Sequence, residues 1–442
     1  MKVVIIGGGA AGLTTASTIR KYNKDIEIYV ITKEKDIAYS PCAIPYVIEG
    51  KIKSFDDIIM HTPKYYKEKK NINILTETEA VDIDSKEQKV KCVKDGEEII
   101  LDYDYLVLAT GSTPFIPPID GVNLEGVFTV KNIEDGRKIL EYMKKCKRVA
   151  VIGAGAIGLE MAYAFKKRGL DVLVVEMAPQ ILPRFLDPDM AEIVQKYLED
   201  EGIKFILSKP LEKIIGKERV EGICVDKVVY DVDMVILSTG VRPNIELAKK
   251  AGVNIGKYAI KVNEKMQTSI NNIYAVGDCV EVIDFITKEK TLSPFGSTAV
   301  RQGKVAGLNI VGREAKFTPV LNSAVSKIGK LEIAGTGLTA FSANLKRIPV
   351  VVGKIKALSR ARYYPGGKDL YIKLIFGDNR KILGGQIVGY ERVSERIDLI
   401  SLAIRNGLTV EDLYLGEYCY CPATKMVNEP ISLAAEDALT KF

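Results

Sequence analysis

Residues 2–12 read KVVIIGGGAAG, and this stretch decides the fold. An apolar strand comes first, from Val3 to Ile6. Gly7, Gly9 and Gly12 follow at dinucleotide spacing, and a helix-like run comes after them. In such a unit the first glycine permits a tight turn, the second admits a pyrophosphate, and the third lets the helix pack on the strand. Because a strand and a helix flank the glycines, the stretch predicts a nucleotide-binding unit.

A second copy of this unit occupies residues 148–176, RVAVIGAGAIGLEMAYAFKKRGLDVLVVE. Gly153, Gly155 and Gly158 have the required spacing, and Glu176 closes the next strand where a ribose-binding carboxylate belongs. Two units predict two bound dinucleotides. A 2′-phosphate would meet like charge at Glu176, which favours NADH, with NADPH as the alternative.

The first copy differs at the ribose position. Its second strand, Glu27 to Ile31, is followed by Thr32 where an acidic residue is expected, and then by Lys33 and Glu34. Glu34 is one candidate for the ribose contact, from two residues further on. The hydroxyl of Thr32 is the other.

A single cysteine stands in residues 38–50, AYSPCAIPYVIEG, without a second cysteine within four or five residues. A thiol delivered by the unit that binds a dinucleotide can lie against the reactive ring of that cofactor, so we expect Cys42 to face a flavin. We also expect Cys42 to open a short helix, whose dipole favours the thiolate. The alternative is a small buried hydrophobic residue.

The composition bounds the class of protein. A chain of 442 residues implies about two to four domains. A net charge of +6 with scattered basic residues argues against nucleic acid as a partner. No signal peptide and no membrane-spanning run are apparent, which predicts a cytoplasmic protein without a membrane partner. The odd number of cysteines argues against disulfides, and the presence of a single histidine, His61, argues against a metal site. His61 is expected to lie in a loop, either solvated or locally hydrogen-bonded.

The remaining segments complete a domain plan. We expect a meander over residues 72–100 and a buried strand in residues 104–113, DYLVLATGST, before a proline-rich linker. Residues 272–279, NIYAVGDC, predict another buried strand, with Asp278 just beyond the glycine, where it can accept hydrogen bonds from a polyhydroxylated chain. After a helix over residues 295–309, the segment from about Phe317 onward has the pattern of an α+β interface domain, with a helix over residues 393–406.

As an ordered set, these motifs resemble the FAD-dependent pyridine nucleotide–disulfide oxidoreductases. The resemblance is to the single-cysteine branch, which holds coenzyme A disulfide reductases, NADH oxidases, NADH peroxidases and archaeal sulfur reductases. It covers essentially the whole chain and rests on GGGAAG, YSPCAIPYVIEG, LATGS, VIGAGAIGLE with VVE, LSTGVRPN, YAVGDC and ARYYPGG.

The resemblance implies an α/β fold of the glutathione-reductase type, with two Rossmann-like dinucleotide-binding domains and a C-terminal α+β dimerisation domain. The implied segments are 1–114 and 244–318 for FAD, 115–243 for NAD(P)H and 319–442 for dimerisation. The cofactor-binding residues expected are Gly7, Gly9, Ala10, Ala11, Gly12, Thr32, Lys33, Glu34, Thr110, Gly111 and Asp278 for FAD, and Gly153, Gly155, Ile157, Gly158, Glu176 and Gly240 for NAD(P)H.

The resemblance also implies the chemistry. Larger members carry two cysteines, but Val47 occupies the second position here, so Cys42 must work alone through a mixed disulfide, persulfide or sulfenic acid. The branch is expected to form homodimers with shared active sites, in which Tyr363 and Tyr420 assist from the partner subunit. Arg20, Ser40 and Lys70 are the expected contacts to coenzyme A, as substrate or bound thiol.

Two alternatives to the reduction of a coenzyme A disulfide, persulfide or polysulfide stay open: an NADH oxidase and a redox-partner flavoprotein. Peroxidases and water-forming oxidases of this branch usually carry a histidine where this chain has Ala10. That difference disfavours a peroxidase, but an NADH oxidase passing electrons to oxygen needs only reduced flavin and access for oxygen. A redox-partner flavoprotein is the third reading. Cys419 and Cys421 are interpreted as structural, since a disulfide between cysteines this close in the chain would be strained.

Overall fold

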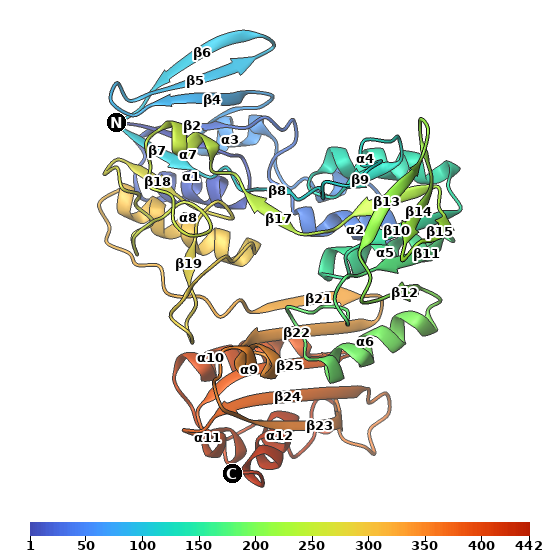
Figure 1. Cartoon of the computed structure of the whole chain (residues 1–442). Helices are drawn as coiled ribbons and strands as arrows, with labels where there is room; N and C mark the ends of the chain where they lie inside the picture. Colours follow the sequence, from blue (N-terminus) through green and yellow to red (C-terminus); the bar gives the residue numbers. More distant parts are fainter. The chain divides into compact units, whose positions relative to one another are not determined.

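The computed structural model describes residues 1–442. The chain forms two compact units. Unit 1 comprises Met1–Phe115, Lys131–Arg137 and Val241–Val320, and unit 2 comprises Ile116–Val130, Lys138–Gly240 and Leu321–Phe442 (Figure 1). No helix has both the length and the apolar character needed to cross a bilayer.

Unit 1 is built on a five-stranded parallel sheet with the order β18-β7-β1-β2-β3. Its elements are β1 Lys2–Ile6, α1 Ala10–Tyr22, β2 Glu27–Ile31, the 3-10 turns Pro41–Ala43 and Asp56–Ile58, α2 Ile44–Glu49, α3 Pro63–Lys70, β3 Asn73–Leu75, β4 Glu79–Asp84, β5 Lys89–Lys94, β6 Glu97–Asp102, β7 Tyr105–Leu108, β8 Ser112–Pro114, β17 Val241–Pro243, α7 Glu246–Lys250, β18 Ile273–Ala275, β19 Val282–Ile283, β20 Lys290–Thr291 and α8 Gly296–Ile310.

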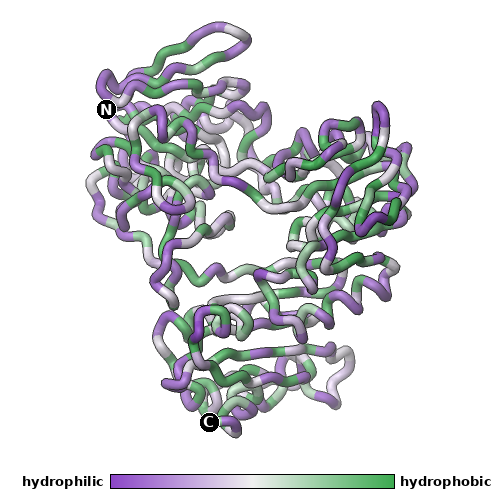
Figure 2. The backbone as a smooth tube through the Cα atoms, viewed as in Figure 1, coloured by the Kyte–Doolittle hydropathy of each residue, from purple (hydrophilic) through white to green (hydrophobic).

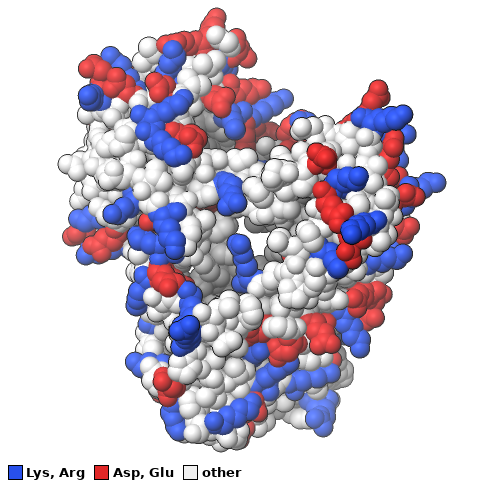
Figure 3. All heavy atoms as spheres, viewed as in Figure 1, with Lys and Arg blue, Asp and Glu red and all other residues white.

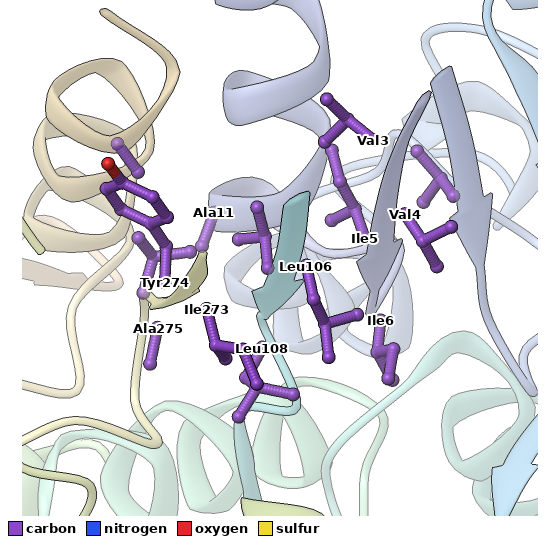
Figure 4. Close-up of a cluster of buried hydrophobic side chains, with 14 of the residues drawn as sticks. Val3, Val4, Ile5, Ile6, Ala11, Leu106, Leu108, Ile273, Tyr274 and Ala275 are labelled. Atoms are coloured by element: carbon purple, nitrogen blue, oxygen red, sulfur yellow. The ribbon is translucent and has the colours of Figure 1, made fainter. Parts of the chain in front are cut away.

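The core of unit 1 is centred on strand β1, which pairs with β2 on one side and with β7 on the other. Val4 lies opposite Tyr29 of β2 and Leu106 of β7. Residues from Val3 to Ile6 are buried, because a parallel strand covered on both faces has no polar side. Figure 4 shows their side chains beside those of β7, β18 and the start of α1. Helices α1 and α8 pack against each other.

Unit 2 repeats the plan in its nucleotide-binding part, with a parallel sheet of order β12-β11-β10-β16-β9. Its elements are β9 Val127–Thr129, α4 Ile133–Tyr142, which begins in unit 1, the 3-10 turn Met143–Lys145, β10 Arg148–Ile152, α5 Ala156–Lys167, β11 Asp171–Val175, α6 Pro188–Asp200, β12 Lys204–Ile206, β13 Leu211–Gly216, β14 Val220–Val225, β15 Val228–Asp231 and β16 Met234–Leu237.

The C-terminal part of unit 2 is a five-stranded antiparallel sheet, β21-β22-β25-β24-β23. Its elements are β21 Ala324–Ile328, β22 Leu331–Gly337, α9 Ala340–Leu345, β23 Val350–Leu358, β24 Asp369–Gly377, β25 Ile382–Gly389, α10 Val393–Arg405, α11 Val410–Tyr414 and α12 Pro430–Leu439. Helix α10 packs on β22 and β25, and α12 packs on β23 and β24. Figure 2 shows hydrophobic runs along the strands and hydrophilic residues in many connecting loops.

A buried polar network ties α6 to this antiparallel sheet. The carboxylate of Asp187, at the start of α6, accepts hydrogen bonds from Gln386 at 2.7 Å and from the backbone of Phe341 at 2.9 Å. The ammonium group of Lys373 lies 3.0 Å from the same carboxylate and 2.7 Å from that of Asp189. Since a buried charge is costly without partners, this network fixes the two elements together.

The predicted fold class is confirmed: two Rossmann-like sheets precede an α+β domain. The helix predicted over residues 393–406 is α10. The meander predicted over residues 72–100 is found in β4, β5 and β6, which form a three-stranded antiparallel sheet, whereas β3 pairs with β2 in the parallel sheet. One segment differs from the expected division. Residues 131–137 pack with unit 1, where Arg137 pairs with Asp36 at 2.7 Å, although we expected them in the NAD(P)H-binding segment.

Candidate functional site

The first glycine loop has the geometry of a dinucleotide cradle. Gly7 has a φ of +120°, and a Cβ there would lie 2.0 Å from the backbone oxygen of Ala109. A Cβ on Gly12 would lie 2.0 Å from the oxygen of Gly7, so helix α1 approaches the turn as closely as it can only with glycine. A Cβ on Gly9 would meet nothing within 4 Å, which leaves open space for a pyrophosphate before Ala10 and Ala11 begin the helix.

Asp278 presents a carboxylate at the end of β18 in the same unit. Its Oδ2 accepts a hydrogen bond from Ser112 at 2.7 Å, and the ammonium group of Lys131 lies 3.1 Å from the Ser112 oxygen and 3.8 Å from Oδ2. The other carboxylate oxygen is left for a ligand hydroxyl. The open space at Gly9 and this oriented carboxylate fit FAD. Sequence reasoning missed Ser112 and Lys131.

The loop after β7 approaches Asp278 from the neighbouring strand. The hydroxyl of Thr110 donates to the backbone oxygen of Asn244 at 2.7 Å. Gly111 has a φ of +66°, and a Cβ there would meet open space. Because β7 and β18 are adjacent parallel strands, their carboxyl ends bring Thr110, Gly111 and Asp278 to one edge of the sheet.

The ribose end of this site lies after β2. Thr32 is buried, and its hydroxyl accepts a hydrogen bond from the backbone N–H of Glu34 at 3.2 Å. The carboxylate of Glu34 accepts one from the hydroxyl of Tyr39 at 2.5 Å. Lys33 is exposed between them. Both ribose candidates are therefore held in unit 1.

Cys42 lies in the 3-10 turn Pro41–Ala43, directly before α2. Its thiol-bearing side chain is exposed, so the reading of Cys42 as a small buried hydrophobic residue is wrong. Pro41 and Pro45 favour these helical starts because their missing N–H groups would have no partner there. Ser40, two residues before the cysteine, is exposed as well. An exposed thiol at a helix start, in the unit that carries the first glycine loop, is available to an incoming sulfur compound.

The side chain of Arg20 is not placed to contact coenzyme A, contrary to expectation. Its guanidinium donates to five backbone oxygens, and its side chain is buried, with a relative exposure of 5%. The five acceptors are those of Asn23 (3.2 Å), Lys24, Ile26 (2.5 Å), Lys70 (3.0 Å) and Asn71 (2.8 Å). A guanidinium has five N–H donors, so Arg20 has none left for a coenzyme phosphate. It fastens the end of α1 to the end of α3.

A groove beside α1 offers other cations. It has a volume of about 340 Å³ and is lined by Ala10, Leu13, Thr14, Ser17, Thr18, Lys21, Tyr66, Val300 and Lys304. The ammonium groups of Lys21 and Lys304 form no ion pair, and polar Thr14 and Ser17 lie along the same helix. Residues 10, 14, 17 and 21 follow helical spacing, which is the signal that places Lys21 rather than Arg20 on this face. Lys70 is exposed at the end of α3 and does not line the groove.

The second glycine loop holds its own carboxylate. Glu176 is buried at the end of β11, and its two carboxylate oxygens accept hydrogen bonds from the backbone N–H groups of Ala154 and Ala178, each at 2.8 Å. Gly153 has a φ of +102°, and a Cβ on Gly155 would meet nothing within 4 Å, as at Gly9. Helix α5 begins at Ala156 and carries Ile157 and Gly158, and Gly240 follows β16 with a φ of +98°. The geometry fits NAD(P)H.

A second acidic residue lies on α5. The carboxylate of Glu160 accepts a hydrogen bond from the hydroxyl of Ser326 on β21 at 2.6 Å. Burial raises the pKa of Glu160 to about 7. The side chain can therefore gain or lose a proton near neutral pH.

Tyr363 and Tyr420 form a pair in unit 2, with their phenol oxygens 2.5 Å apart. Two anchored loops bring them together. Arg360 binds Glu391 through two nitrogens, with distances of 2.6 and 3.2 Å to one oxygen. Arg396 binds Glu429 in a buried pair at 2.5 Å. Both tyrosines are exposed, at 74% and 45%, and can contact another molecule.

The remaining cysteines and the histidine make no such arrangement. Cys419 and Cys421 are exposed thiols on either side of Tyr420 and are not joined by a disulfide. His61 lies in a loop, as expected, where it is partly exposed and stacks on Tyr65 with ring centroids 4.0 Å apart. No group of three or more His, Cys, Asp or Glu side chains is arranged to hold a metal ion.

Comparisons with known proteins agree with this geometry. Residues 1–303 match the family described as pyridine nucleotide-disulphide oxidoreductase, and residues 323–429 match its dimerisation domain. The chain is 74% identical to an NADH oxidase of Methanocaldococcus jannaschii, over 100% of this chain and 99% of that protein. It is 38% identical to the NAD(P)H coenzyme A polysulfide/persulfide reductase of Pyrococcus horikoshii, over 98% of this chain and 97% of that one.

A solved structure is similar along the whole chain. The NAD-dependent persulfide reductase from A. fulgidus superposes with a TM-score of 0.98 at 38% identity, covering 100% of this chain and 83% of that chain.

Proposed function

The chain belongs to the pyridine nucleotide-disulphide oxidoreductase family and is an FAD-dependent NAD(P)H oxidoreductase, and on that premise we propose that it reduces a coenzyme A disulfide, persulfide or polysulfide with NADH. The observation that carries this proposal is the exposed Cys42 at the start of a helical turn, in the unit that holds the first glycine loop. The relative from P. horikoshii, a coenzyme A polysulfide/persulfide reductase, supports it.

The groove along α1 suits coenzyme A. Its polar wall and two unpaired ammonium groups, at Lys21 and Lys304, complement an anionic phosphate-bearing ligand. The groove begins at Ala10, the residue that opens α1 next to the glycine loop. We propose Lys21 and Lys304 as the phosphate contacts, with Lys70 and Ser40 at the margins and Arg20 outside the set.

Each residue of the site has a proposed part in the reaction. FAD, when bound, accepts a hydride from NADH and supplies two electrons to the acceptor. The thiolate of Cys42 attacks one sulfur of the disulfide, forming a mixed disulfide and releasing one thiolate. The two electrons then cleave that mixed disulfide, and a proton converts the second released thiolate to a thiol. Cys42 returns to its starting state.

The tyrosine pair is the proposed proton source. One phenol donates to the other, so the pair keeps one O–H for a third group. Residues 323–429 match the family's dimerisation domain, which supports our proposal that the protein forms a homodimer. We propose that each pair serves the Cys42 of the partner subunit.

Oxygen is the second candidate acceptor. The M. jannaschii relative, 74% identical, is an NADH oxidase. In that reading reduced flavin is sufficient, and Cys42 alters the product rather than the ability to oxidise NADH. The disulfide reading requires Cys42 for turnover. We propose NADH over NADPH in both cases, because the Glu176 carboxylate repels a 2′-phosphate.

Mass spectrometry of the protein purified without reductant tests the proposal. We expect an adduct of coenzyme A mass on the peptide that contains Cys42, removed by NADH under anaerobic conditions. The exposed thiols of Cys419 and Cys421 are the internal control and should carry no adduct that NADH removes. An unmodified Cys42 that also fails to react with added coenzyme A disulfide would contradict the proposal.

A further inference from the structure

We propose that Glu34, held in place by Tyr39, binds the adenosine ribose of FAD. In other dinucleotide-binding units this contact comes from an acidic residue at the end of the second strand, a position that Thr32 occupies in this chain. This inference rests on the proposed function, because it requires FAD at the first glycine loop. It assigns the ribose contact between two candidates and adds a positioning residue.

Thr32 stands where the ribose-binding acid is expected, but it offers a buried hydroxyl in place of a carboxylate. It is 8% exposed, and its hydroxyl accepts the backbone N–H of Glu34 at 3.2 Å. A Cβ on Gly8 would lie 3.0 Å from the Cβ of Thr32, so the side chain packs against the glycine loop. Thr32 supplies the wall of the site and no carboxylate.

Glu34 supplies that carboxylate from two residues on. Its Oε2 accepts the hydroxyl of Tyr39 at 2.5 Å, and its Oε1 has no hydrogen-bond partner. Its backbone oxygen accepts the N–H of Glu77 at 3.3 Å, which holds the loop. The side chain is half-buried. A half-buried carboxylate with one occupied and one open oxygen is prepared to accept a ribose hydroxyl.

Tyr39 orients this carboxylate from a fixed position. Burial, together with the charge of Glu34, raises the pKa of the Tyr39 phenol, which therefore stays a donor throughout the physiological range. Tyr39 also lies three residues before Cys42. The loop that carries the thiol thus holds the ribose-binding acid as well.

The chain offers a matched control on β2. The hydroxyl of Tyr29 donates to the carboxylate of Glu27 at 2.9 Å, in a second tyrosine–glutamate hydrogen bond. Glu27 is exposed at the start of the strand, whereas the ribose site lies beyond the end of the strand. Glu27→Gln removes the same charge at the start of β2 without touching the proposed site.

The test is the affinity of the flavin-free protein for two ligands, FAD and the FAD analogue that lacks the 2′-hydroxyl of the adenosine ribose. Binding is followed by quenching of flavin fluorescence, independently of turnover. We expect Glu34→Gln to weaken FAD binding roughly ten- to hundredfold but to change binding of the analogue by less than about threefold. Tyr39→Phe should weaken FAD binding several-fold, and the double variant should be no weaker than Glu34→Gln alone. Glu27→Gln should match the wild type.

The inference is overturned if Glu34→Gln binds FAD as tightly as the wild type does, or if it weakens FAD and the analogue equally. In either case the proposed function stands, because the wild-type protein still binds FAD. If the wild type binds neither ligand, the proposed function fails together with the inference.

Discussion

The phenol oxygens of Tyr363 and Tyr420 lie 2.5 Å apart, although the two residues are 57 positions apart in the sequence. The hydrogen bond to Tyr363 is the largest cause that raises the pKa of Tyr420. We therefore expect Tyr363→Phe to lower the pKa of Tyr420 toward the usual value of about 10. The pKa of Tyr420 is measured by titrating the phenolate absorbance of the Tyr363→Phe variant and subtracting the titration curve of the variant in which both tyrosines are phenylalanine.

The same pair predicts non-additive kinetics. Removal of either hydroxyl should lower turnover with coenzyme A disulfide about tenfold or more. Removal of both hydroxyls should lower turnover little further than removal of one. Losses that multiply in the double variant would show that the two tyrosines act separately.

Arg20 and Lys21 are neighbours with opposite predicted roles. Arg20→Lys leaves several backbone oxygens without donors, so we expect the free energy of unfolding to fall by about 2–4 kcal/mol while the KM for coenzyme A disulfide barely changes. Lys21→Met should raise that KM about tenfold and change stability by less than about 0.5 kcal/mol. Urea denaturation of both variants measures the free energy of unfolding, and steady-state kinetics measures the KM for coenzyme A disulfide. The reversed pattern would restore Arg20 as a ligand contact.

Glu160 predicts a dependence of stability on pH. Its pKa is raised by burial to about 7, so the folded state favours the protonated acid. This contribution is complete below about pH 4.5 and is lost as the pH rises toward 7, by at most about 3 kcal/mol. Glu160→Gln should flatten that part of the stability profile, measured by urea denaturation from pH 5 to 8. The exposed Glu199 on α6 is the control: Glu199→Gln should leave the profile unchanged.

Glu176 sets the predicted choice of nicotinamide cofactor. Its carboxylate is fixed by Ala154 and Ala178 and would face a 2′-phosphate with like charge. We expect Glu176→Gln to lower kcat/KM for NADH about tenfold or more, and to lower the preference for NADH over NADPH. Equal losses with both cofactors would mean that Glu176 only supports the glycine loop.

Much of this arrangement could be predicted from local sequence. Both glycine loops follow from spacing, because a strand, a turn and a helix are adjacent in the chain. The position of Cys42 before α2 follows in the same way. Thr32 signalled an unusual ribose site, since the expected acid is missing at a defined point of the motif.

Other features depend on contacts that the sequence does not mark. Ser112 and Asp278 are 166 positions apart and meet only because β7 and β18 are neighbours in the sheet. Arg20 and Lys21 are adjacent basic residues that the sequence alone does not distinguish. Successive residues of a helix are rotated by about 100°, so Arg20 points toward backbone oxygens whereas Lys21 lines the groove. Figure 3 shows basic and acidic side chains interspersed on the visible surface, so charge alone would not have singled out Lys21.

The central claim is that one sulfur, that of Cys42, transfers the electrons to the acceptor. Cys42→Ser tests it most directly, with the rate of NADH-dependent coenzyme A disulfide reduction measured on protein whose FAD content is known. We predict a full complement of FAD and a loss of disulfide reduction of at least about a hundredfold. A Cys42→Ser protein that holds FAD and still reduces the disulfide at the wild-type rate would contradict the account.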